Sequence, residues 1–277
     1  MHIVILTNDN FFSFTVLKEF MARRRQDIKL VVFSSALIGK RGLVSSIRWS
    51  LTQTGFRHTV FKLMVYGIFK VMKMVCKLLP FIPNFYSSHL WTRRNNINSI
   101  ISANINEIKT VEHIKAVNPD LIVSVSMNQI VKKEILDLPL KRCINVHCAP
   151  LPRYGGMSPY VWALANNEDH SAATIHYMDE GFDTGDVIVQ EKIDVVKDDS
   201  AFALFYRCCQ RAGVLLNNVV DEIELDKVSS YKQDLSQKTY FSWPTKACVK
   251  NLRQNGYRLA KTTDFTCAIF NHKPRVE

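Results

Sequence analysis

The stretch from Cys143 to Glu191, CINVHCAPLPRYGGMSPYVWALANNEDHSAATIHYMDEGFDTGDVIVQE, decides the fold and the expected site. Asn145 and His147 stand two residues apart at the end of an apolar run, so in a strand both side chains project from one face. Asp183 follows in the turn DEGFDTG of residues 179–185. An amide, an imidazole and a carboxylate brought together by a fold suit general base catalysis with oxyanion stabilisation. We therefore expect Asn145, His147 and Asp183 to be the catalytic residues.

This stretch resembles the folate-dependent formyltransferases. The family motif runs roughly Asn-x-His-x-Ser-Leu-Leu-Pro-x-(aromatic)-x-Gly, followed later by Asp-x-Gly-x-Asp-Thr-Gly. The residues that match it, in order and at the family's spacing, are Asn145, His147, Leu151, Pro152, Arg153, Tyr154, Gly156, Asp179, Gly181, Asp183, Thr184 and Gly185. Ala149 and Pro150 depart from the motif, where Ser and Leu are usual, and these differences concern the shape of the loop rather than the catalytic positions.

The resemblance implies a doubly wound, Rossmann-like α/β fold with a mostly parallel sheet. It also implies transfer of a formyl group from the co-substrate 10-formyltetrahydrofolate to a primary amine, which makes the chain an N-formyltransferase. In the family, the loop after the strand of residues 121–126 holds the folate pterin. The residues expected to bind the co-substrate are therefore Met127, Asn128, Gln129, Ile130, Val131, Asp179 and Gly181, and those expected to bind the acceptor are Pro152, Arg153, Tyr154 and Gly155.

The three catalytic candidates suit this reaction independently of the resemblance. An amine that attacks a formamide carbon creates an oxyanion, which the Asn145 amide and a protonated His147 could bind. The amine must also lose a proton, which a neutral His147 could accept directly or through water. Asp183 would orient the imidazole or hold the relaying water. Each residue alone has an ordinary structural explanation, as a turn former or a buried histidine, and only their joint spacing favours catalysis.

Composition indicates a globular cytoplasmic protein without a metal. The chain has 277 residues, of which 47% are hydrophobic, enough for a sizeable core. The apolar run at residues 2–6 is too short for a signal peptide. The seven cysteines form an odd number without a C-x-x-C pair, which argues against a disulfide framework and a zinc site. The histidines other than His147 show no metal-ligand spacing, so we assign no metal.

The positive charge is concentrated in one segment. The formal net charge is +11, and residues 28–106 contain eleven basic residues and no acidic one. The remainder has 36 − 11 = 25 basic residues against 25 acidic ones, so it is neutral. This distribution indicates that a negatively charged partner meets the segment.

The order of the predicted elements supports an α/β domain. Residues 2–6 and 28–33 predict strands around a helix at 12–23, which is a β-α-β opening. Further strands are predicted at 99–103, 121–126, 142–147, 172–178 and 187–193, and further helices at 110–116, 159–165 and 200–223. We expect a catalytic domain over residues 1–235 with a basic helical insertion at about 36–94, and a short C-terminal extension over 236–277. That extension is too short for the β-barrel that follows the catalytic core of methionyl-tRNA formyltransferases.

The middle of the insertion, residues 60–79, predicts a long apolar helix. At 100° per residue, Lys62, Lys70, Lys73 and Lys77 fall at about 0°, 80°, 20° and 60°, on one narrow arc. Four lysines make a transmembrane helix too costly. Two interpretations remain: a helix in an anionic membrane interface with its lysines towards the head groups, or a helix packed on the domain or on a second subunit of a homodimer.

The acceptor is predicted by exclusion. Residues 7–12 have no glycine with which to hold a ribonucleotide phosphate, so a purine-pathway substrate is not expected. The leading hypothesis is a nucleotide-linked amino sugar for cell-surface polysaccharide. The alternatives are a lipid-linked or other small amine at the membrane surface, hydrolysis of formyltetrahydrofolate, and a non-catalytic scaffold. Nucleic-acid binding is not expected, because the basic segment pairs its lysines with an apolar helix rather than an aromatic groove.

Overall fold

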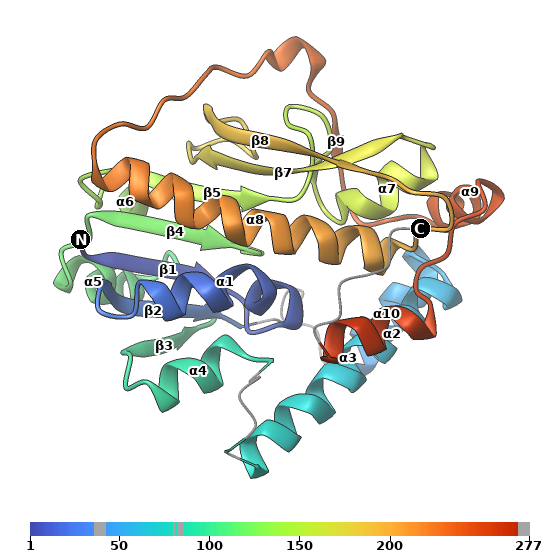
Figure 1. Cartoon of the computed structure of the whole chain (residues 1–277), viewed down its shortest axis with the longest axis horizontal. Helices are drawn as coiled ribbons and strands as arrows, with labels where there is room; N and C mark the ends of the chain where they lie inside the picture. Colours follow the sequence, from blue (N-terminus) through green and yellow to red (C-terminus); the bar gives the residue numbers. More distant parts are fainter. Residues whose placement is uncertain (36–42, 80, 82–85, 271–277) are drawn as a thin grey trace.

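A mostly parallel seven-stranded sheet forms the centre of the chain (Figure 1), here described from a computed structural model for residues 1–35, 43–79, 81 and 86–270. The strand order is β3-β2-β1-β4-β5-β7-β8; the pairs from β3 to β5 are parallel, and β7 and β8 are antiparallel to their neighbours. The strands are β1 (Ile3–Thr7), β2 (Ile28–Ser34), β3 (Ser99–Ser102), β4 (Leu121–Val125), β5 (Cys143–His147), β7 (His170–Tyr177) and β8 (Val187–Asp194). The predicted α/β class is confirmed.

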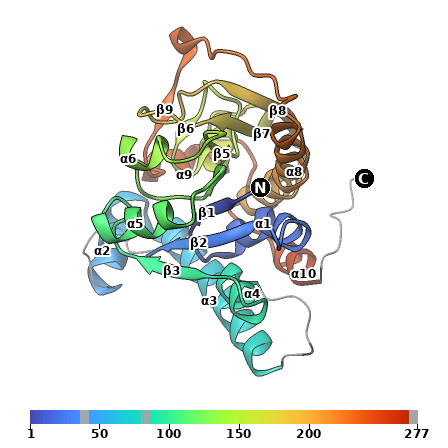
Figure 2. The same cartoon turned by 90° about the vertical axis from the view of Figure 1, so that its left-hand side faces the viewer.

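Helices cover both faces of the sheet because its central strands are apolar on both sides. Ile3 and Ile5 of β1 pack against α1 (Phe11–Arg23) and α8 (Ala201–Glu224), whereas Val4 and Leu6 pack on the side of α5 (Ile108–Ala116) and α6 (Lys133–Leu136). Figure 2 shows these two layers on opposite sides of the strands. All five residues of β1 are buried, so the first strand needs a cover on each face.

The insertion is helical, as predicted, and one face of its long helix is packed on the domain. It consists of α2 (Leu43–Gln53), α3 (Phe56–Leu78) and α4 (Ser88–Arg94); residues 36–42, 80 and 82–85 of the expected insertion lie outside the described part. Phe61 and Phe69 of α3 join a buried cluster, in which the rings of Phe69 and Phe11 stack with centroids 3.7 Å apart. The packed interpretation is therefore confirmed for this face of α3.

The four lysines of α3 do not form one uniform solvated arc, so this part of the sequence interpretation was wrong. Lys62 Nζ lies 3.5 Å above the Trp243 ring, and the Lys73 ammonium forms an ion pair with Asp9. Only Lys70 and Lys77 are exposed. Helical periodicity places side chains on a helix, but the elements that pack around the helix decide which of them reach solvent.

The loop after β1 contains no phosphate-binding glycine, and its residue Asp9 binds the insertion instead. Its carboxylate accepts hydrogen bonds from Ser87 Oγ at 2.8 Å and from the backbone N–H of His89 at 3.2 Å, in addition to the ion pair with Lys73. The loop after β1 therefore holds α3 and α4 through the Asp9 carboxylate.

The C-terminal residues pack back onto the domain. β9 (Tyr240–Phe241) pairs with β6 (Gly155–Gly156), α9 (Lys246–Gln254) contacts α7 (Pro159–Ala165), and α10 (Thr262–Phe270) contacts α8. A short 3₁₀ turn at Leu235–Gln237 precedes β9. The division at residue 235 stays a prediction, and residues 271–277 of the expected extension lie outside the described part.

Because of the buried residue His58 in α3, we expect the free energy of unfolding to fall at acidic pH. The side chain is fully buried and neither ring nitrogen has a hydrogen-bond partner within the described chain; burial, with the nearby Lys62 ammonium, lowers the pKa of His58 to about 3. The unfolded chain binds a proton here below pH ~6.5 while the folded chain does not, so stability falls by up to about 1.4 kcal/mol per pH unit from pH 6.5 to 3. His58→Phe should keep or raise stability at pH 7, by about 1 kcal/mol, because an unsatisfied buried polar group is removed.

Urea unfolding at pH 7.5 and pH 5 measures this effect. The wild-type free energy of unfolding should fall more than that of His58→Phe over this range, by about 2 kcal/mol. His113→Phe, at an exposed histidine, is the control. Its free energy of unfolding should fall between pH 7.5 and pH 5 by the same amount as that of the wild type. An equal pH dependence in wild type and His58→Phe would contradict the prediction.

Candidate active site

The end of β5, the end of β7 and the loop of residues 178–186 bring four polar side chains together. Asn145 and His147 project from one face of β5, and antiparallel pairing places His176 of β7 directly opposite Asn145. Asp183 Oδ1 lies 3.8 Å from Nδ1 of His147 and 3.8 Å from Nε2 of His176. The structure thus brings Asn145, His147 and Asp183 together as expected, and their catalytic roles stay a prediction.

The hydrogen bonds of His147 define which of its nitrogens is free to accept a proton. Nε2 lies 3.0 Å from the carbonyl oxygen of Tyr154, which only accepts, so Nε2 carries a hydrogen. The neutral ring then presents the lone pair of Nδ1 on the side of Asp183. A proton taken up at Nδ1 produces an imidazolium next to the Asp183 carboxylate, which stabilises it.

His176 was not predicted from the sequence, and it fixes the amide of Asn145. Nδ1 of His176 donates to the carbonyl oxygen of Tyr177 at 2.7 Å, so the neutral ring accepts at Nε2 from Asn145 Nδ2, 3.1 Å away. Burial lowers the pKa of His176, and the neighbouring Asp183 opposes this only in part. One N–H of the Asn145 amide is thereby held by His176, which leaves its second N–H for a ligand. The antiparallel register of β5 and β7 would have indicated this residue.

Asp183 is held as a carboxylate. Burial raises the pKa of Asp183, but His147, the backbone N–H of Gly156 and His176 together more than offset this, so the pKa lies below its ordinary value. The Gly156 N–H donates to Asp183 Oδ2 at 2.9 Å. Asp183 has φ +53°, a left-handed conformation that Asp tolerates better than most residues. The structure thus fixes an ionised side chain beside two imidazoles.

Gly156 is required where the catalytic loop meets β9. Its φ is +95°, and a Cβ at this position would lie 2.3 Å from the carbonyl oxygen of Phe241. Only glycine therefore allows the backbone to approach β9 and to direct its N–H towards Asp183.

The expected acceptor-binding residues mainly shape this loop. Arg153 forms an ion pair with Glu168, and the Tyr154 hydroxyl donates to the same carboxylate at 2.7 Å. Pro152 and Gly155 accept and donate backbone hydrogen bonds with Thr239, at 3.2 and 3.0 Å. The side chains of Arg153 and Tyr154 are thus already engaged within the protein, and an acceptor role for the four residues stays a prediction.

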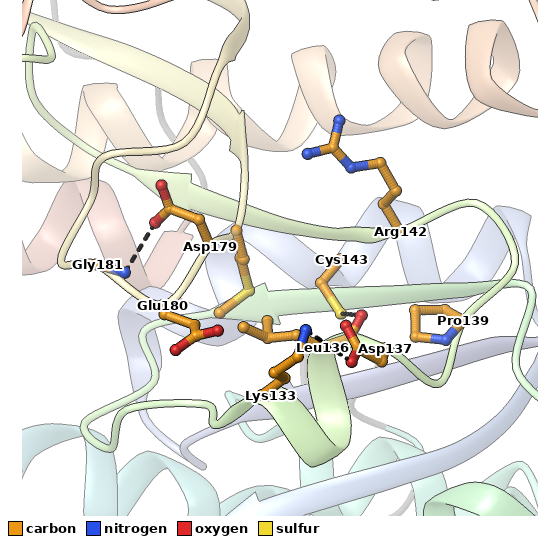
Figure 3. A pocket seen from close by; sticks show the side chains of 10 residues that line it. Lys133, Leu136, Asp137, Pro139, Arg142, Cys143, Asp179, Glu180 and Gly181 are labelled. Atoms are coloured by element: carbon orange, nitrogen blue, oxygen red, sulfur yellow. Dashed lines mark hydrogen bonds and ion pairs between the residues drawn. The ribbon is translucent and has the colours of Figure 1, made fainter.

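A cavity of about 660 Å³ opens under the first half of the Asp183 loop (Figure 3). Its apolar side chains include Leu136, Cys143 and Met178, and its polar residues include Asp179 and Gly181, two of the expected co-substrate residues. The turn is tight at Gly181, because a Cβ there would lie 2.1 Å from Thr184 Oγ1. The volume lies in the range of small-molecule pockets, about 300 to 1,000 Å³.

The other expected co-substrate residues, Met127 to Val131, lie in the loop after β4 and do not line this cavity. Val131 is buried in the core, while Asn128 Oδ1 accepts from Ser34 Oγ at 2.7 Å and Gln129 Oε1 accepts from the Ile105 N–H at 3.0 Å. Met127 is partly buried and Ile130 is 50% exposed. The side chains of Asn128, Gln129 and Val131 are engaged within the protein, so a contact with the co-substrate would come from the backbone of this loop or from Met127 and Ile130.

The cavity fits the chemistry of a folate. Leu136, Cys143 and Met178 provide an apolar wall for a flat heterocycle, and the carboxylates of Asp137 and Glu180 can accept from its amino and ring N–H groups. Two cations also line the cavity, but Lys133 is paired with Asp137 at 3.0 Å and the Arg142 guanidinium lies 4.1 Å above the Tyr177 ring, so a folate carboxylate would have to compete with these partners. Within the described residues, no group of three or more His, Cys, Asp or Glu side chains is arranged to bind a metal.

The fold and the site define an α/β protein with a His-Asp-Asn cluster suited to group transfer. Residues 89–220, which contain the whole cluster, match the family model described as formyl transferase. This segment is just under half of the chain and is similar to the formyl transferase family, in agreement with the resemblance seen in the sequence. The expected N-formyltransferase activity is supported by this match and stays a prediction.

Individual relatives differ in their acceptors. Methionyl-tRNA formyltransferase from Clostridium acetobutylicum is 36% identical over 135 residues, covering 49% of this chain and 44% of that protein. Two solved structures share the fold at 19% identity and cover 88% of this chain. The sugar N-formyltransferase from Shewanella sp. FDAARGOS_354 has a TM-score of 0.57 with 77% of its chain covered. The N-formyltransferase from Helicobacter canadensis, in complex with folinic acid and dTDP-3-aminofucose, has a TM-score of 0.56 with 71% covered. The chain spans less than half the length of the Clostridium relative it matches.

Proposed function

We propose that this chain transfers a formyl group from 10-formyltetrahydrofolate to a primary amine. The observation that carries the proposal is the cluster of Asn145, His147 and Asp183, in which the Asp183 carboxylate lies 3.8 Å from His147 Nδ1, within a segment that matches the formyl transferase family model. When bound, the co-substrate supplies the formyl carbon. The amine nitrogen attacks this carbon, and the second N–H of Asn145 binds the oxyanion. His147 Nδ1 accepts the proton of the amine and returns it to the departing nitrogen, while Asp183 stabilises the imidazolium.

The acceptor that we propose is a nucleotide-linked amino sugar for cell-surface polysaccharide. The fold is shared with sugar N-formyltransferases over most of the chain. The loop after β1 has no phosphate-binding glycine and is occupied by its contacts with the insertion. A lipid-linked or other small amine at the membrane surface is the second candidate, because α3 exposes apolar side chains. The seven free thiols favour a cytoplasmic location.

Mass spectrometry of the acceptor tests the proposal. The chain is incubated with 10-formyltetrahydrofolate and, separately, nucleotide-linked 3-amino and 4-amino sugars or methionyl-tRNA. Formamide formation on a sugar alone supports the proposed acceptor, and formylation of methionyl-tRNA alone replaces it. Formate released at the same rate without any amine indicates a hydrolase. No consumption of 10-formyltetrahydrofolate with any acceptor would contradict the catalytic proposal as a whole.

A further inference from the structure

The outer face of α3 carries a continuous apolar stripe that no part of the described chain covers. Side chains at helical spacing of three and four residues are 42 to 71% exposed along it: Phe56, Val60, Leu63, Met64, Val71, Met74 and Leu78. Gly67 lies in the same stripe, with no atom within 4 Å of the position a Cβ would take. We call these eight residues the outer stripe. It runs along the whole length of the helix, which is unusual for a surface helix.

The outer stripe is distinct from the face that packs on the domain. Phe61, Phe69 and Cys76 are buried on that inner face. At about 100° per residue, the stripe lies on the opposite side of the helix from them. Both views show the last turns of α3 projecting beyond α4 (Figures 1 and 2), and the apolar side chains of the stripe are exposed. A helix that is apolar on two opposite faces has two partners, and the domain is only one of them.

Positive charges border the stripe. Arg57 lies on one side of it and Lys70 and Lys77 lie on the other, and all three are exposed. Lys62 and Lys73 point towards the domain, where they meet Trp243 and Asp9. No acidic residue occurs from residue 28 to residue 106, so the insertion has no charge of its own to neutralise these cations.

This charge pattern disfavours a second copy as the partner. A two-fold dimer through α3 would place a set of cations opposite an identical set, without the acidic residues that normally accompany such seams. A span across the bilayer is also disfavoured, since among the described helices none is long and apolar enough to cross it. An apolar stripe bordered by cations fits an interface in which apolar chains lie below anionic groups.

We propose that the outer stripe binds the surface of an anionic phospholipid bilayer, with α3 lying in the plane of the interface. Its apolar side chains enter the boundary between head groups and acyl chains, and Arg57, Lys70 and Lys77 contact lipid phosphates. This binding does not depend on formyl transfer. Only one consequence rests on the proposed function: binding would bring the chain to the second candidate acceptor, a lipid-linked or other amine at the membrane surface.

Flotation of the full chain with vesicles tests this proposal. Phosphatidylcholine vesicles are compared with vesicles that contain about one third phosphatidylglycerol, at low and at high salt. The wild type should float with the anionic vesicles at low salt and separate from them at high salt. Met74→Glu with Leu78→Glu should reduce the partition coefficient at least about tenfold, because buried apolar area is lost and charge repulsion is added. A triple variant in which Gln replaces Arg57, Lys70 and Lys77 should have a partition coefficient about 100-fold lower than that of the wild type, roughly fivefold per charge.

Matched variants outside the stripe control for general effects. The first control variant, Ile108→Glu with Leu140→Glu, changes two exposed apolar residues. The second control variant removes three exposed cations by changing Lys227, Lys232 and Lys250 to Gln. Both variants should bind vesicles like the wild type. Thermal unfolding checks that every variant is folded, and formyl transfer to a soluble amine is measured separately. Wild-type protein that stays unbound at low salt would overturn the proposal. Analytical ultracentrifugation tests the alternative. If the wild type is a dimer that the double variant Met74→Glu with Leu78→Glu dissociates, and if the wild type does not bind vesicles, the stripe is assigned to a second copy instead.

Discussion

Asp183→Asn is expected to lower turnover by about three orders of magnitude while the fold is retained. The asparagine oxygen can still accept the Gly156 N–H that now reaches Asp183 Oδ2 at 2.9 Å, so the loop should keep its position. The charge that stabilises a protonated His147 is lost, however, and general acid-base catalysis contributes roughly 10²- to 10⁴-fold. Since the effect arises in the chemical step, kcat should fall and the KM for the amine should change little.

Steady-state kinetics with the acceptor identified by mass spectrometry measures this effect. Asp198→Asn is a matched control, because Asp198 is exposed and also has a left-handed backbone, with φ +67° compared with +53° for Asp183. It should have wild-type kinetics. Near-normal turnover of a folded Asp183→Asn protein would refute the role assigned to this carboxylate. The lowered pKa of Asp183 adds a second expectation: loss of activity above pH 4 does not come from protonation of this group.

The sequence was sufficient for the central strands because β1, β2, β4 and β5 are short apolar runs that are almost wholly buried. Residues 121–125 and 143–147 are predicted within one residue, and the Asn145 and His147 side chains share a face because strand alternation requires it. Asp183 was predicted by its spacing in a motif rather than by any local property. The distance of 3.8 Å between its carboxylate and His147 depends on how the loop of residues 178–186 crosses β5.

The contributions of His176 and Thr239 could not be predicted from local sequence. His176 joins the site only because β7 runs antiparallel to β5 in a register that pairs it with Asn145, and one residue of slip would remove it from that face. Thr239 O accepts from the N–H of Gly155 across a gap of 84 residues, 239 − 155. The two-residue strands β6 and β9 carry no hydrophobic pattern that would indicate such a pairing.

The environment of α3 shows the limit of helical periodicity. Periodicity correctly predicted a long apolar helix with its lysines on one side, but a pattern of spacing contains no information about the neighbours of each face. Lys62 and Lys73 belong to the same predicted arc as Lys70 and Lys77. In the structure, however, Lys62 lies over the Trp243 ring and Lys73 forms an ion pair with Asp9. These partners come from segments far apart in the chain, so only the tertiary structure distinguishes the packed face from the outer stripe.

His147→Gln is expected to lower kcat/KM by about 10²- to 10⁴-fold, the contribution expected of a general base. Glutamine carries an amide N–H that can replace the hydrogen bond from His147 Nε2 to the Tyr154 carbonyl, 3.0 Å in the wild type. It has no basic nitrogen to replace Nδ1, so the loop should stay in place while proton transfer is lost.

His113→Gln is the control for this substitution, because Nδ1 of His113 also bonds to a backbone carbonyl, that of Lys109 at 2.6 Å, at an exposed position outside the site. It should leave kcat/KM and its pH profile unchanged. Binding of 10-formyltetrahydrofolate, followed by fluorescence or calorimetry, should be similar in both variants, because His147 does not line the cavity. A His147→Gln protein that binds the co-substrate and still transfers formyl at the wild-type rate would show that the proton leaves the amine by another route, such as a water held by Asp183.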